Sequence, residues 1–145
     1  MYSKILVAVE NSPRDRRVID HVEQLATLTG AVVVLVHVAD GWAARYFNEL
    51  KLRESEEMIG DRAYLERLRQ ELQAHGLTVD TRLGLGDPAT EICRVAAEEQ
   101  VDLIAMGTHG HRGVSDVLHG ETVDHVRHRV RIPVLLVRTE KPAAE

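Results

Sequence analysis

The chain has 145 residues, enough for one domain with one full hydrophobic core. Hydrophobic residues make up 44% of it and charged residues 28%, which is typical of a globular protein and excludes wholesale disorder. The net charge of −5 argues against a nucleic-acid partner, and the single cysteine, Cys93, excludes an internal disulfide.

The first residues lead directly into a buried strand. Residues 5–9, I-L-V-A-V, form a continuous apolar run of the kind that parallel sheets cover on both faces. The preceding M-Y-S-K lacks the cleavage region of a signal peptide. The longest strongly apolar run, residues 31–39, is far too short to span a bilayer. We therefore expect a cytoplasmic protein without a membrane partner.

A helix is expected after this strand. Ser12 is the predicted N-cap, Pro13 occupies the first helical position, and Asp15 completes an approximate capping box. Gly30 is the predicted residue just beyond the helix end. Apolar residues at helical spacing predict one inward stripe, made of Val18, Ile19, Val22, Leu25 and Ala26.

The second strand is expected over residues 32–38, V-V-V-L-V-H-V, with His37 as a hydrogen-bonded core or loop-contact histidine. Residues 42–52 are ambiguous and would form a short amphipathic turn or a lid. From Ser55 to His75 the spacing is helical, and Gly76 ends the helix. Its predicted inward residues are Met58, Ile59, Leu65, Leu68 and Leu72.

The second half of the chain continues this alternation. Residues 77–85 alternate between apolar and polar, which predicts a strand near a sheet edge. Asp87-Pro88 begins a helix with Ala89, Ile92, Cys93 and Ala96 inward. A strand over 101–106, a helix from Thr122 to about Val130 and a strand over 132–137 follow. Residues 1–138 thus form the expected domain, and residues 139–145 a flexible tail.

Strands that alternate with helices predict a parallel sheet with helices on both faces, because crossover connections are right-handed. In such sheets ligands bind beyond the carboxyl ends of the strands, where the strand order reverses. Residues 10–12 and the segment from Gly107 onward both follow strand ends. These two loops are therefore the expected walls of a site.

The stretch 107–120, G-T-H-G-H-R-G-V-S-D-V-L-H-G, is the most suggestive loop in the chain. Gly107 and Gly110 would let a ligand approach the backbone, and Gly120 stands where the next helix is expected to begin. A helix start offers unpaired N–H groups to a phosphate. The spacing G-x2-G-x9-G is neither a P-loop nor a dinucleotide fingerprint, and turn formation alone would also explain the glycines.

The chain resembles the universal stress protein family over essentially its full length. The resemblance rests on the first strand, the V-H-V end of the second, and M-G-T-H-G-x9-G followed after twelve residues by P-V-L-L-V. It implies a single-domain, doubly wound, five-stranded parallel sheet of order 3-2-1-4-5 with four helices on both faces, an adenine-nucleotide alpha-hydrolase-like fold. It also implies a sensor or regulator in the stress response that binds ATP or another adenine nucleotide.

The resemblance also implies which residues contact the nucleotide. The adenosine end would be lined by Ala8, Val9, Glu10 and Val38, with Met106 packed on the base or ribose. The ribose and first phosphate would contact Gly107, His109 and Gly110. The remaining phosphates would receive helix-start N–H groups from Gly120, Glu121, Thr122 and Val123.

Three residues depart from the family pattern. Asn11 replaces a usual Gly, whose left-handed conformation Asn can adopt. Glu10 replaces a usual Asp and is one methylene longer. Glu121 stands where ATP-binding members have Ser or Thr, and its carboxylate would repel a phosphate unless Mg²⁺ bridged them. The site could thus bind ATP with Mg²⁺, prefer AMP or a cyclic nucleotide, or be empty.

The last strand predicts a homodimer. Pro133 lacks an N–H and so favours an edge strand, yet the strand is apolar and would invite pairing. A symmetric dimer through this edge resolves the conflict, and the resemblance implies the same. The expected interface residues are Ile132, Val134, Leu135, Leu136 and Val137.

No catalytic or metal-ligating residue is expected. The protein should therefore hydrolyse ATP slowly at most. His109, His111 and His119 with Asp116 match no standard zinc spacing. Two alternatives remain open beside a nucleotide sensor with an unidentified protein partner. One is a nucleotide-independent dimeric interaction module whose phosphate site Glu121 disables. The other is a small phosphotransferase that uses Glu10 or Asp116 with Mg²⁺.

Overall fold

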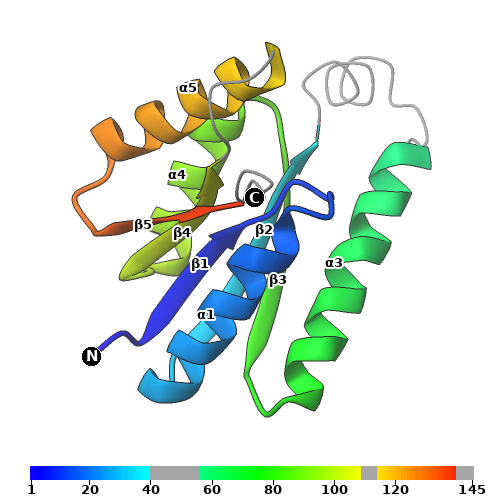
Figure 1. Ribbon diagram of the computed structural model, residues 1–145, viewed down its shortest axis with the longest axis vertical. Helices are drawn as coiled ribbons and strands as arrows, with labels where there is room; N and C mark the ends of the chain where they lie inside the picture. Colours follow the sequence, from blue (N-terminus) through cyan, green and yellow to red (C-terminus); the bar gives the residue numbers. More distant parts are fainter. Residues whose placement is uncertain (40–55, 109–113, 140–145) are drawn as a thin grey trace, which may run out of the picture.

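Strands and helices alternate along the chain, as predicted (Figure 1). The computed structural model describes residues 1–39, 56–108 and 114–139, without the side chains of 56–57 and 114–120. The elements are β1 (Lys4–Ala8), α1 (Asp15–Thr29), β2 (Val32–Ala39), α3 (Glu56–Ala74), β3 (Val79–Leu85), α4 (Pro88–Glu99), β4 (Leu103–Thr108), α5 (Val114–Arg129) and β5 (Val134–Arg138).

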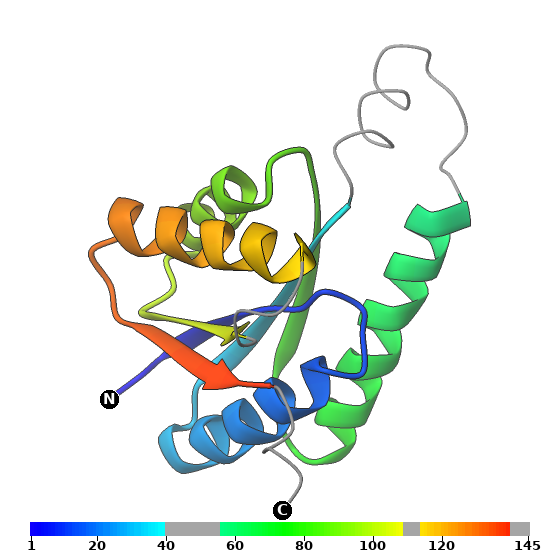
Figure 2. The ribbon, with the colours of Figure 1, turned by 45° about the horizontal axis from the view of Figure 1, so that its top comes forward.

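The sheet has five parallel strands in the order β3-β2-β1-β4-β5, which confirms the expected topology. Helices α1 and α3 cover one face, and α4 and α5 cover the other (Figure 2). The central strand β1 pairs with β2 on one side and with β4 on the other. The strand order reverses between β1 and β4, so the carboxyl ends of these two strands flank the expected binding crevice.

Two hydrophobic clusters explain the apolar runs. Side chains of β1 alternate between them: Ile5 and Val7 pack under α1 and α3, whereas Leu6 packs under α4 and α5. All three are fully buried. Because each face of the central strands is covered, these strands carry no polar face and read as continuous apolar runs.

The predicted start of α1 is wrong by two residues. Ser12 does not cap the helix, which begins at Asp15 with no side-chain cap. Instead, the buried Asp15 carboxylate accepts hydrogen bonds from the backbone of the loop that precedes it. The predicted end is confirmed, since Gly30 is left-handed (φ 75°) and its N–H donates to the Ala26 carbonyl at 2.8 Å.

The next two helices follow the predictions with one error. Met58, Leu65, Leu68 and Leu72 are buried as expected, but Ile59 is 54% exposed. Met58, Leu65, Leu68 and Leu72 define the buried face of α3, and Ile59, about 100° around the helix from Met58, falls outside it. Asp87 is the N-cap of α4 and accepts a hydrogen bond from the Thr90 N–H at 2.9 Å. None of the helices in the described part of the chain is long and apolar enough to cross a membrane.

The predicted start of α5 at Gly120 to Thr122 is also wrong, because the helix begins at Val114. In the sequence Val114, Val117 and Leu118 have helical spacing, so the periodic pattern extends across Gly120, a residue that helices tolerate at a cost of about 1 kcal/mol. Only the first four N–H groups of a helix lack intrahelical partners. The amides of residues 120–123 lie beyond that turn, so they are not helix-start donors.

Candidate functional site

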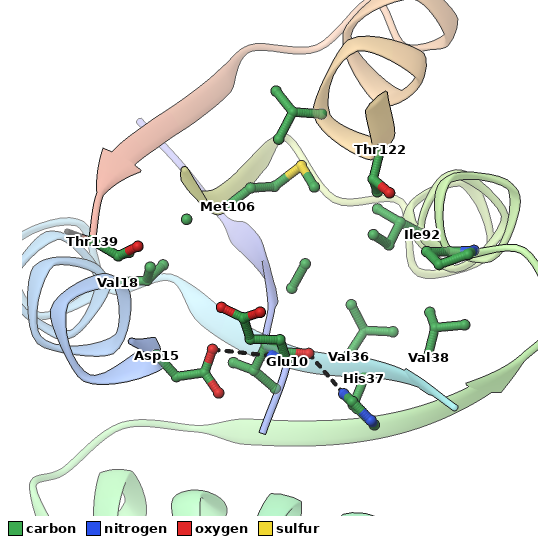
Figure 3. Close-up of a pocket in the computed structure, with 15 residues that line it drawn as sticks. Glu10, Asp15, Val18, Val36, His37, Val38, Ile92, Met106, Thr122 and Thr139 are labelled. Atoms are coloured by element: carbon green, nitrogen blue, oxygen red, sulfur yellow. Dashed lines mark hydrogen bonds between the residues drawn. The ribbon is translucent and has the colours of Figure 1, made fainter. Parts of the chain in front are cut away.

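A pocket opens at the carboxyl ends of β1, β2 and β4, where a ligand was expected (Figure 3). Its volume is about 160 Å³. A single water needs roughly 10–15 Å³, so the pocket can take an organic ligand. Its apolar lining comprises Ala8, Val9, Val18, Val36, Val38, Pro88, Ile92, Met106, Gly107 and Val123. Its polar lining comprises Glu10, Asp15, His37, Thr122 and Thr139.

The fold brings most of the predicted contact residues together. Those that line the pocket are Ala8, Val9, Glu10, Val38, Met106, Gly107, Thr122 and Val123. Glu121 is exposed and is not among the lining residues, and Gly120 lies inside α5. His109, Gly110 and the predicted lid over 42–52 lie outside the described residues.

The end of β2 extends beyond β1 at the pocket. The last pair between these strands is Ala8 with Val36, followed by a hydrogen bond from the Val9 N–H to the Val36 carbonyl at 2.9 Å. Strand residues two apart direct their backbone groups to the same side. The N–H and C=O of Val38 therefore face the side where β1 has ended.

The loop after β1 is organised by Asp15 at the start of α1. Its buried carboxylate accepts hydrogen bonds from the N–H groups of Glu10 at 3.0 Å, Asn11 at 2.9 Å and Ser12 at 3.2 Å. Asn11 is left-handed, with φ 61°, which confirms the conformation expected for this substitute for Gly. The loop is thereby wrapped around one carboxylate, and Glu10 is held at the rim of the pocket.

Helix α3 reaches the same loop with two side chains one turn apart. The Tyr64 hydroxyl donates to Asp15 Oδ2 at 2.6 Å, and the Asn11 amide donates to Asp61 Oδ1 at 2.9 Å. Burial and the hydrogen bond to Asp15 both raise the pKa of Tyr64, so its hydroxyl remains a donor at neutral pH. His37 Nδ1 lies 2.8 Å from the Val9 carbonyl oxygen, so the expected loop-contact role of this histidine is confirmed.

Gly107 is needed for packing as well as for lining the pocket. A Cβ at this position would lie 2.9 Å from Thr139 Cγ2 and 3.1 Å from Val18 Cγ2. Thr139 is buried, and its N–H donates to the Thr108 carbonyl at 2.9 Å. The prediction of a flexible tail is therefore wrong at its first residue, because Thr139 extends the pairing of β5 with β4 by one bond.

Sequence reasoning missed seven lining residues: Asp15, Val18, Val36, His37, Pro88, Ile92 and Thr139. Two had a usable signal. Val36 lies two residues before Val38 and so shares its strand face, and Pro88 begins the helix that follows the edge strand β3. Asp15 and Thr139 had none, since their roles depend on partners that the fold brings near.

Cys93, His125 and His128 are not among the residues that line the pocket. Burial raises the pKa of the Cys93 thiol, which disfavours the reactive thiolate. His125 and His128 are exposed on α5, and His128 Nδ1 lies 2.7 Å from the Asp124 carbonyl oxygen of its own helix. Among the described residues no three His, Cys, Asp or Glu side chains gather closely enough to hold a metal ion.

The chain is similar to known proteins along its whole length. A sequence model of the Universal stress protein family matches residues 1–138. Universal stress protein MJ0577 of Methanocaldococcus jannaschii is 30% identical over 158 residues, which span 95% of this chain and 96% of that protein. The solved structure of MJ0577 matches with a TM-score of 0.81 and 29% identity, covering 98% of this chain and 99% of that one.

Two further solved structures share the fold and hold a nucleotide. A universal stress protein in complex with cAMP has a TM-score of 0.70 and 22% identity, and the match covers 96% of this chain and 98% of that one. A universal stress protein from Archaeoglobus fulgidus in complex with dAMP has a TM-score of 0.68 and 23% identity, with coverage of 93% and 97%. Because both sequence identities are below 25%, these two matches show only that the fold is shared.

Proposed function

Because the chain belongs to the universal stress protein family, we propose that it binds an adenine nucleotide in the pocket at the carboxyl ends of β1, β2 and β4. The observation that carries this proposal is an apolar pocket at which β2 continues beyond its last pair with β1, so that the backbone of Val38 faces the ligand side. Structures of the same fold that hold cAMP and dAMP support it.

The base would lie in the apolar part of the pocket. Val36, Val38 and Ile92 line one region of it, and Met106 lies across from them (Figure 3). An adenine ring presents apolar faces and a polar edge with both donors and acceptors. The faces would pack on these side chains, while the polar edge would pair with the N–H and C=O of Val38.

The ribose would lie against Glu10. Its carboxylate can accept hydrogen bonds from the ribose hydroxyls, as acidic residues do in other nucleotide-binding sheets. The Glu10 backbone is fixed by the hydrogen bond of its N–H to Asp15 at 3.0 Å. The bond fixes where the Glu10 side chain begins, and its extra methylene relative to the usual Asp would let the carboxylate reach further toward the ribose.

The phosphates would extend toward Gly107 and the start of α5. The unpaired N–H groups of this helix belong to its first turn, Val114–Val117, and Thr122 adds a hydroxyl to the pocket lining. His109 and Gly110 would complete this end. We expect ATP, with Mg²⁺ as the counter-charge, or AMP and cyclic AMP as ligands of the same pocket.

The biological role that follows is that of a cytoplasmic stress-response sensor or regulator. Nucleotide occupancy would change the surface offered to an unidentified protein partner. The protein would act as a homodimer paired through β5, whose outer edge is free of strand pairing in the described sheet and whose Leu136 is 40% exposed.

The alternative function is a nucleotide-independent dimeric interaction module. One observation favours it: α5 begins at Val114, so residues 120–123 do not present the helix-start N–H groups that the phosphates were expected to use. In that case the pocket would stay empty in the cell and the dimer surface would carry the function.

Calorimetric titration of the full chain, stripped of nucleotide, tests the proposal. ATP, AMP and cyclic AMP are titrated with and without Mg²⁺ into wild type, Glu10→Gln and Glu121→Gln. The two variants make the same chemical change, one inside the pocket and one at an exposed residue outside its lining. Glu10→Gln removes a charged hydrogen-bond acceptor from the pocket, so its affinity for the nucleotide should be about tenfold to hundredfold lower than that of wild type. Glu121→Gln should bind the nucleotide about as tightly as wild type.

Each result separates the two functions. One nucleotide bound per chain, weakened only by Glu10→Gln, supports the nucleotide sensor. Equal weakening by both variants would show that Glu10 acts no differently from an exposed carboxylate outside the pocket, and would reject its role as the ribose acceptor. No heat from any nucleotide would reject the sensor and leave the interaction module.

A further inference from the structure

A single peptide group at the rim of the pocket is held from both sides. The Val9 carbonyl oxygen lies 2.8 Å from His37 Nδ1, and the N–H of the next residue, Glu10, donates to Asp15 Oδ1 at 3.0 Å (Figure 3). Val9 and Glu10 both line the pocket. The orientation of this peptide group therefore sets the wall against which a ligand would lie.

The second ring nitrogen of His37 faces a buried carboxylate from α3. His37 Nε2 lies 3.1 Å from Asp61 Oδ2, and the two side chains are only 11% and 5% exposed. Oδ1 of Asp61 accepts from the Asn11 amide, but Oδ2 is buried and receives no hydrogen bond of standard geometry from the described residues. The imidazole is thus the group positioned to neutralise this oxygen.

The protons can be counted from these contacts. A carbonyl oxygen only accepts, so His37 Nδ1 must carry a proton to bond Val9. In the neutral ring Nε2 would then turn a lone pair toward Asp61 Oδ2, which an ionised carboxylate would repel. The arrangement is attractive only when one more proton sits between Nε2 and Oδ2. The His37–Asp61 pair is therefore built to hold one proton more than a neutral histidine beside a carboxylate.

We propose that the His37–Asp61 pair is a protonation switch for the ligand site. With the extra proton in place, the pair holds the Val9–Glu10 peptide group and Asn11, and the pocket binds its ligand. When the pH rises until that proton is lost, His37 and Asp61 repel each other and the loop is released. Because the binding-competent form carries more protons, ligand affinity falls as the pH rises. The ligand part of the proposal rests on the proposed function.

The other charged groups around His37 leave this pair as the switch. Among the described residues, α1 contributes Asp15, which accepts from the Glu10 N–H of this peptide, and the first loop contributes the Glu10 carboxylate. Tyr64 of α3 has a raised pKa, caused by burial and by its bond to Asp15, so it does not titrate where histidines do. On β3, Leu83 is paired with His37, and the adjacent Arg82 turns to Glu98 on α4 at 2.6 Å.

The first test is made without ligand. Nitrogen NMR of the full chain labelled in its histidine rings, between about pH 5 and about pH 9, reads the protonation of each ring nitrogen. Both nitrogens of His37, or Nδ1 together with Asp61, should carry a proton at neutral pH. Amide exchange of Glu10 and Asn11, corrected for intrinsic pH effects, should accelerate about tenfold once that proton is lost.

Two substitutions and one matched control sharpen this test. His37→Gln retains a donor for the Val9 carbonyl but cannot titrate, and Asp61→Asn removes the carboxylate that holds the proton. Either should make the loop amides insensitive to pH. His75→Gln removes the ring of a second His–carboxylate pair, with Glu23, near the other end of α3, and should leave the loop response unchanged. A wild-type His37 with a single proton at neutral pH, beside an ionised Asp61, overturns the proposal without any substitution.

The second test adds AMP as the probe. Its association constant in wild type should fall about tenfold or more between about pH 6 and about pH 9, and should stay nearly flat in His37→Gln. Binding that is equally strong across this range in wild type rejects the linkage to ligand. Absence of AMP and ATP binding at every pH rejects the proposed function and its regulation, while the ligand-free measurement still decides whether the loop switch exists.

Discussion

At the scale of single residues, Gly107 links the stability of the fold to the pocket. A methyl group there would press on Thr139 Cγ2 at 2.9 Å and Val18 Cγ2 at 3.1 Å. Thr139 is tied to the Thr108 carbonyl and cannot easily move away. We expect Gly107→Ala to lower the free energy of unfolding by about 1–3 kcal/mol, as overpacking of cores does. Guanidinium denaturation measures this free energy, and an unchanged m-value would show that the two proteins unfold in the same way.

Gly60 provides the matched control. It lies inside α3, and an added Cβ would meet nothing within 4 Å. Gly60→Ala should raise the free energy of unfolding by about 0.5–1 kcal/mol, because Ala loses less backbone entropy in a helix. A Gly107→Ala variant as stable as wild type would show that Thr139 and Val18 yield without cost.

At the scale of elements, the N-cap of α4 makes stability depend on pH. The Thr90 hydroxyl and N–H donate to Asp87 Oδ2 at 2.7 Å and 2.9 Å. These bonds hold the pKa of Asp87 below its ordinary value of 3.8. The stabilisation is therefore present above that value and lost as the pH falls through the lowered folded-state pKa. Asp87→Ala should cost about 1 kcal/mol at neutral pH and nearly nothing in strong acid.

Asp87→Asn separates the cap from its charge. The amide oxygen can still accept from the Thr90 N–H but does not titrate, so Asn should retain much of the capping energy with no dependence on this group at low pH. Urea midpoints of the three proteins measured along the acid limb compare them directly. An Asp87→Ala deficit that stays constant into strong acid would contradict the ionised cap.

At the scale of the whole molecule, β5 carries the expected dimer contact. Val134, Leu135 and Val137 are partly buried against the two clusters, whereas Leu136 is 40% exposed. An apolar side chain on an unpaired strand edge favours association. We expect wild type to sediment as a dimer and Leu136→Lys as a monomer, because a second copy would have to bury the ammonium group.

A substitution at Leu28 tests whether replacing any exposed leucine by lysine would dissociate the dimer. Leu28 is 85% exposed on α1, a helix that is not part of the sheet edge. Leu28→Lys makes the same chemical change and should leave the sedimentation coefficient at the dimer value. Wild type that remains monomeric at every concentration would reject the dimer through β5.

The site was predictable where it depends on strand ends and not where it depends on distant partners. The rule that ligands bind at the carboxyl ends of parallel strands pointed to the loops that begin at Glu10 and Gly107, and both residues line the pocket. The family resemblance added Ala8, Val9 and Met106, which line it too. Their positions were set by local apolar runs. The start of α5 was misplaced, because Gly120 looks like a helix boundary in sequence but lies inside a longer helix.

The sequence by itself determined the alternation of strands and helices, the parallel sheet and the family resemblance, because periodicity and turn residues are local properties of the chain. Only the tertiary structure decided that Asp61 reaches Asn11, 50 residues away, and that Tyr64 reaches Asp15. These contacts depend on how α3 packs beside α1 and β2. A hydrogen bond requires its atoms to lie within about 3 Å, and residue spacing along the sequence does not encode that distance between elements.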